Sequence, residues 1–148
     1  MTRMCWLLLA VSIAITAPAA AAPSLEETLR GFDLLGSWAP DCGEAPSPLH
    51  PHATYSAEPS GQASMIYDPG PSAPRSAYAI LSAERVTDDK LVLREEWLHD
   101  HSRLDVTLRK FRGKMKVWYS REAGGNTLVE DGTVVATGYV SPWMTRCL

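Results

Sequence analysis

From residue 52 onward the chain consists of short runs that alternate apolar and polar residues, each ended by a turn sequence. The runs cover residues 52–57, 62–68, 76–86, 90–99, 103–111, 114–120, 127–129 and 133–136. Asp131-Gly132, between the last two runs, is a strong two-residue hairpin signal. No helical period interrupts the series, so the pattern predicts an all-β fold, an antiparallel up-and-down barrel of about eight strands.

The alternation also predicts which side chains share a face. Three sets of residues are expected on common faces: Leu91, Leu93, Glu95 and Trp97; Met115, Val117 and Tyr119; and Ala77, Ala79 and Ala83. A closed barrel of eight strands leaves an interior that is filled by side chains or holds one small ligand. The three alanines would leave such room.

Glu95 is the one charged residue on an otherwise apolar face. A buried charge needs a partner or water. Glu95 therefore either lies at a solvated rim or points into a ligand cavity, with Arg94 or Arg109 as its partner. The residues expected around such a cavity are Tyr78, Glu95, Trp97, Arg109 and Trp118.

The first 21 residues have the order of a secretory signal peptide. Arg3 precedes an apolar run over residues 6–15, and small residues follow at 17–22. We expect cleavage after Ala20 or Ala21, which leaves a single domain at residues 22–148 in the periplasm or outside the cell. The apolar run is shorter than the ~20 residues that span a bilayer, and no second such run follows.

Cys42 and Cys147 remain in the exported domain. Two cysteines in an exported chain most simply form one disulfide, and two separate thiols are the alternative.

Residues 24–32 predict one short helix. Ser24 and Glu27 have the spacing of a capping box, and Leu25, Leu29 and Phe32 fall on one face. Such a short helix needs an apolar surface to lie against, and one end of the barrel would provide it.

Charge and motifs exclude several functions. Without Arg3, 13 Lys and Arg face 17 Asp and Glu, and this mildly acidic balance argues against nucleic acid. No nucleophile elbow is present, and Glu95 and Glu96 alternate faces on a strand, so no paired acid/base site is expected. We therefore expect neither an enzyme nor a cofactor.

The four histidines form two His-x-His pairs, His50/His52 and His99/His101. This spacing could supply nitrogen ligands to zinc or copper. However, the first pair lies in a Pro-rich loop and the second spans a turn, so solvated histidines are the expected outcome.

Gly36-Ser37-Trp38, just after the predicted helix, resembles the Gly-x-Trp motif on the first strand of lipocalins and related calycin barrels. The resemblance implies that Trp38 closes one end of the barrel and that a late arginine, here Arg146, packs across its ring. The chain is similar as well to the exported barrels with which bacteria inhibit their own secreted metalloproteases. There the N-terminal segment, residues 22–25 here, would be the inhibitory part.

The expected function is non-catalytic binding of a small apolar or amphipathic ligand by a monomeric, lipocalin-like protein. The alternative is a barrel that binds a protein, such as a periplasmic protease inhibitor or an envelope assembly factor. A binder needs an open interior, whereas an interaction protein should have an interior filled by Leu, Met and Trp.

Overall fold

The computed structural model describes residues 21–148, so the predicted signal peptide lies outside the described residues except for its last position. One antiparallel sheet of ten strands has the order β10-β1-β2-β3-β4-β5-β6-β7-β8-β9. Its elements are α1 (Leu25–Gly31), β1 (Gly36–Ala39), β2 (His52–Ala57), β3 (Ala63–Asp68), β4 (Ser76–Thr87), β5 (Lys90–Trp97), β6 (Arg103–Phe111), β7 (Lys114–Glu122), β8 (Thr127–Glu130), β9 (Thr133–Val134) and β10 (Thr145–Cys147).

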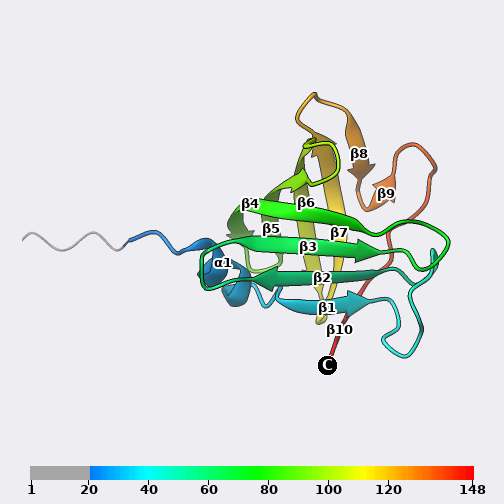
Figure 1. The fold of residues 1–148 in the computed structure, drawn as a ribbon, viewed down its shortest axis with the longest axis horizontal. Helices are drawn as coiled ribbons and strands as arrows, with labels where there is room; N and C mark the ends of the chain where they lie inside the picture. The colour runs from blue at the N-terminus through cyan, green and yellow to red at the C-terminus, as the bar shows by residue number, and fades with distance from the viewer. Residues whose placement is uncertain (1–20) are drawn as a thin grey trace, which may run out of the picture.

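The sheet curls into a half-barrel with α1 against one end of β2, β3 and β4 (Figure 1). The long connection of residues 40–51 lies beyond the other end. The all-β antiparallel prediction is confirmed, with ten strands where about eight were expected. The three-residue strand β10, which pairs with β1, is too short to show an alternating pattern of its own.

Helix α1 forms where its capping sequence predicts. The Ser24 hydroxyl accepts from the Glu27 backbone N–H at 3.2 Å, and the Glu27 carboxylate accepts from the Ser24 N–H at 2.7 Å. This reciprocal pair satisfies two N–H groups that a helix start otherwise leaves open. Leu29 is fully buried on the face toward the sheet.

Two basic side chains from the sheet hold the other end of the helix. Lys110 of β6 donates to the carbonyl oxygens of Phe32 and Asp33, and Arg85 of β4 donates to that of Gly31. Cations are favourable at a helix C-terminus because the last carbonyls carry partial negative charge.

The half of the interior next to α1 is filled by side chains. Its fully buried members are Leu29, Leu34, Trp38, Leu91, Leu93, Leu108 and Met115. The Trp38 indole N–H donates to the Leu34 carbonyl at 2.7 Å, so the one polar atom of this ring is satisfied.

Two irregularities change the faces that alternation predicts. In β4 the register with β5 shifts between Ile80 and Ser82, so Ala83 packs on the core while Ala79 lines an outer groove. The prediction that Ala77, Ala79 and Ala83 share a face is therefore wrong. A bulge adds one residue to one strand and reverses the facing of everything beyond it.

A second shift lies in β7, opposite Thr107 and Leu108 of β6. Met115 and Val117 face inward as predicted, but past the shift Ser120, not Tyr119, is the buried residue. Tyr119 instead approaches the Thr127 hydroxyl at 3.5 Å.

A disulfide joins Cys42 to Cys147, with Cα atoms 5.4 Å apart and a sequence separation of 105. This confirms the predicted bond. Across residues 21–148, no helix has the length and hydropathy needed to cross a bilayer.

Candidate ligand cavity

The half of the interior away from α1 contains a cavity of about 320 Å³. Most of its wall comes from the parts of the strands that lie away from α1: late β3, early β4, late β5, early β6 and late β7. The middle of β2 and the segment 128–144 complete it. On β4, for example, Tyr78 lines the cavity, whereas Arg85 at the other end of the strand contacts the helix. Helix α1 and the cavity thus occupy opposite ends of the molecule.

Most of the cavity wall is apolar. Its aliphatic, proline and methionine residues are Pro51, Met65, Leu104, Val106, Val117, Leu128, Val129, Val134, Pro142 and Met144. Ser120 and Ser141 add hydroxyl groups. A cavity of this size and composition fits the lower end of the ~300–1,000 Å³ range of small-molecule sites.

Four tyrosines complete the wall: Tyr55, Tyr67, Tyr78 and Tyr139. Burial raises the pKa of Tyr55, and the nearby Glu95 carboxylate raises it further. Burial likewise raises the pKa of Tyr67 and of Tyr78. These three hydroxyls therefore keep their protons at neutral pH and offer both a donor and an acceptor.

Glu95 of β5 is the charged residue of the wall. Its cross-strand neighbours are Ile80 and Leu104, and only 2% of its surface is exposed. Its Oε1 has no hydrogen-bond partner among the described residues. Burial raises the pKa of this carboxyl to about 7. Of the two positions considered for Glu95, the structure shows the inward one.

Neither arginine proposed as a partner reaches Glu95. Arg94 pairs with Asp105 at 3.3 Å, and Arg109 pairs with Asp89 at 3.4 Å. Both arginines are next to inward-facing residues in sequence, Glu95 and Leu108, so the pleat sends them to the outer face. No Lys, Arg or His is present among the residues that line the cavity.

Of the five predicted cavity residues, the structure places Tyr78 and Glu95 on the wall. Trp97 stands beside it, with its ring centroid 6.4 Å from that of Tyr78. Trp118 and Arg109 lie together elsewhere, with the guanidinium carbon 4.7 Å from the indole centroid. Alternation sets Trp118 opposite Met115 and Val117, and the structure places it there, beside Arg109 and Lys116.

Sequence reasoning missed Tyr55, Tyr67, Ser120 and the segment from Tyr139 to Met144. The alternation in 52–57 could have identified Tyr55, which shares a face with the buried Ala53. The segment 139–144 has no alternation and reaches the wall through isolated bridges, such as Met115 to Met144.

The residues expected to close the barrel lie at the helix end. Gly36 has φ +119°, and a Cβ there would come within 3.2 Å of Arg146 Nε. Arg146 lies opposite Trp38 in the β1–β10 register, but its guanidinium pairs with Asp33 at 2.5 Å. The cation over the Trp38 ring is Lys110 instead, with Nζ 5.6 Å from that centroid and 4.7 Å from that of Phe32.

The four histidines lie in different surroundings. His52 Nε2 lies 3.1 Å from the Glu44 carbonyl, His101 Nδ1 lies 3.0 Å from a Glu96 oxygen, and the His99 ring lies 5.2 Å from that of Trp97. His50 Nδ1 is buried without a partner among the described residues. In the part of the chain that the structure describes, no three His, Cys, Asp or Glu side chains are grouped to hold a metal ion.

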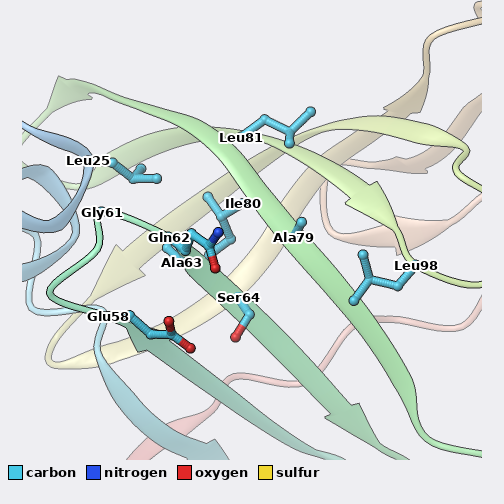
Figure 2. Close-up of a pocket in the computed structure, with 10 residues that line it drawn as sticks. All are labelled: Leu25, Glu58, Gly61, Gln62, Ala63, Ser64, Ala79, Ile80, Leu81 and Leu98. Atoms are coloured by element: carbon cyan, nitrogen blue, oxygen red, sulfur yellow. The ribbon is translucent and has the colours of Figure 1, made fainter.

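A second hollow, of about 520 Å³, runs over the outer face of β3 and β4. Figure 2 shows Leu25 at its α1 end and Leu98 at the other, with Ser64 and Ala79 between them. Leu81 and Leu98 are 43% and 49% exposed. This outer groove presents apolar side chains to solvent.

The N-terminal residues proposed for protease inhibition are partly engaged in the fold. Ser24 caps α1, and Leu25 packs against the core from a half-buried position.

Comparisons with protein-family models, with curated proteins and with solved structures find no match to this chain.

Proposed function

We propose that this protein binds a small, largely apolar molecule, without catalysis, in the cavity at the end of the sheet away from α1. The observation that supports this most directly is the cavity of about 320 Å³ with the unpartnered, buried Glu95 on its wall. Small-molecule sites combine apolar walls with a few placed polar groups that fix the ligand's orientation.

The division of the interior favours this function over its alternative. Side chains fill the half near α1, whereas in the other half tyrosines, serines and aliphatic, proline and methionine side chains surround an open space. An interior devoted only to stability would be packed throughout, because interiors reach the density of organic crystals.

The proposal includes a lipocalin-like architecture in which the sheet closes as a barrel, and a monomer exported to the periplasm or beyond. Its support is the position of Gly36 and Trp38 on β1 just after α1, the sequential order from β1 to β9, and the disulfide. Disulfides persist in oxidising compartments, which fits export.

A second candidate is a protein-binding function that uses the outer groove. The exposed Leu81 and Leu98 along β3 and β4 favour it.

Two measurements test the ligand proposal. Native mass spectrometry of protein prepared gently from its source should show a small mass that is lost on denaturation. Titration with the neutral fluorophore N-phenyl-1-naphthylamine should give saturable binding.

A matched pair of variants locates the binding. Val134→Trp fills the cavity and should abolish fluorophore binding, whereas Val135→Trp, at an exposed neighbour that does not line the cavity, should not. Binding that persists in Val134→Trp and disappears on mutation of Leu81 and Leu98 to Ser would move the site to the outer groove.

A further inference from the structure

Glu95 narrows the class of ligand, in an argument that rests on the proposed function. The structure buries this carboxyl group and leaves Oε1 without a partner among the described residues. The wall offers no compensating base, because it includes no Lys, Arg or His, and Arg94 and Arg109 pair instead with Asp105 and Asp89. We propose that the ligand is a small organic cation, a protonated amine on an apolar body, held by the Glu95 carboxylate.

The charge balance of the cavity supports an ammonium ion. An ionised carboxylate in apolar surroundings is costly unless a cation pairs with it. A protonated amine supplies that cation and donates to the open Oε1. With a neutral ligand, the Glu95 carboxyl group would either be protonated or remain an ionised group without a cation beside it.

The tyrosines suit the same ligand. Four of them share the wall with Glu95, from β2, β3, β4 and the segment after β9. Aromatic rings attract cations across their faces, and a phenol oxygen accepts from an ammonium N–H. The aliphatic residues, such as Leu104 and Val106, would contact the apolar body of the ligand.

Proton linkage gives this inference a distinctive signature. The pKa of the Glu95 carboxyl is about 7 without a ligand, so binding a cation at lower pH must expel a proton. As pH increases toward 7, the affinity for an amine should therefore increase by up to about tenfold per pH unit, and above pH 7 it should level off. The other titratable groups on the wall are the four tyrosines, and burial raises the pKa of Tyr55, Tyr67 and Tyr78 further above this window.

Calorimetric titration of the full domain with two probes of nearly equal size tests the proposal. Phenethylamine carries an ammonium group, and 2-phenylethanol replaces it with a hydroxyl. At pH 8 the amine should bind at least about tenfold more tightly, a difference of about 1.4 kcal/mol. Its affinity should fall between pH 7 and pH 6, while that of the alcohol should not.

Two neighbouring variants serve as probe and control. Glu95→Gln should remove both the preference for the amine and its pH dependence. Glu96→Gln should keep both, because Glu96 faces outward and pairs with His101 and Arg103.

The outcomes separate the two proposals. Equal or tighter binding of the alcohol would overturn the cationic ligand and leave the cavity function intact. The same holds if neither probe binds but the neutral fluorophore still does so and Val134→Trp blocks it. If none of the three probes binds, both proposals fail.

Discussion

At the scale of single residues, Glu95 is the position where stability and the proposed function conflict. A leucine there would continue the apolar face formed by Leu91 and Leu93. Glu95 carries a carboxyl group instead, and burial raises the pKa of that group. Folding therefore favours its protonated form. Groups that destabilise a fold in this way are concentrated at functional sites.

The pH dependence of stability tests this account of Glu95. Its pKa rises from 4.5 to about 7 on folding, so between these values the folded state holds more protons than the unfolded state. The contribution of Glu95 to stability is therefore greatest below pH 4.5 and is lost as pH rises through 7, by on the order of 3 kcal/mol. In urea unfolding, the free energy of unfolding of Glu95→Gln relative to that of the wild type should increase by about this amount between pH 4.5 and pH 8.

The difference between the two proteins isolates the Glu95 contribution, because all other titrating groups are shared. Parallel pH profiles would show that this carboxyl is not held above its ordinary pKa. Glu96→Gln, which removes a partly exposed carboxylate on the outer face from the next residue, should retain the decline between pH 4.5 and 7.

At the scale of elements, α1 depends on the sheet more than on its own length. Seven residues are too few for an isolated helix, and the structure supplies a capping box at one end and basic side chains at the other. Lys110 does this from a partly buried position that lowers its pKa. The same ammonium lies over the Phe32 and Trp38 rings.

Lys110→Met should therefore cost about 1–3 kcal/mol, because it leaves carbonyls at the helix end unpaired and removes the cation from both rings. Arg146→Met should cost at most about 1 kcal/mol, since its pair with Asp33 is solvent-exposed. Chemical denaturation followed by tryptophan fluorescence measures both. A larger loss for Arg146→Met would make Arg146 the more important of the two cations.

The hairpin between β8 and β9 gives a second test at this scale. Asp131 and Gly132 have φ values of 49° and 75°, as a two-residue turn of the predicted kind requires. A Cβ on Gly132 would also lie 2.4 Å from Lys116 Cε, and the Lys116 ammonium lies 5.7 Å and 5.4 Å from the Trp118 and Trp143 ring centroids. Gly132→Ala should cost about 1–3 kcal/mol.

Gly124→Ala is the matched control, since nothing lies within 4 Å of a Cβ there and its φ is not positive. That change should alter the unfolding free energy by less than about 0.5 kcal/mol. Equal effects at the two glycines would contradict the account of Gly132 as a position whose positive φ disfavours a side chain.

The strands show what an alternation of apolar and polar residues can and cannot predict. Alternation located β6 at its observed bounds and β4, β5 and β7 to within two residues at each end. It failed at the bulges near Ile80 and Thr107, because an inserted residue leaves no mark on composition while reversing the faces beyond it. Glu95, on an unbroken strand, was predicted on the same face as Leu91 and Leu93, but alternation left open whether that position is a solvated rim or a cavity. Trp118 was assigned to the cavity although alternation sets it opposite Met115 and Val117, and that assignment is wrong.

At the scale of the molecule, side chains fill the interior at the end of the sheet beside α1, and the interior at the other end holds the cavity. The Cys42–Cys147 bond ties β10 and the segment after β1 together. The cysteine pairing was predictable because only two cysteines follow the predicted signal peptide. The contribution of residues 139–144 to the cavity was not, since it depends on long-range bridges.

Replacing both cysteines by alanine should lower the free energy of unfolding by about 2–5 kcal/mol, because a 105-residue loop in the unfolded chain is released. Thermal unfolding of the double variant and of the reduced wild type should agree. A melting temperature equal to that of the oxidised protein would show that the bond adds nothing to the pairing of β10 with β1.

The pairing of β1 with β10 also sets the order in which the sheet can assemble. Each strand from β1 to β8 pairs with the next strand along the chain, so these contacts can form locally as synthesis proceeds. One edge of β1 has its partner more than 100 residues away, at Thr145–Cys147. Until those residues are made, that edge is an open template for other chains, and the risk of aggregation lasts as long as the final strand is missing.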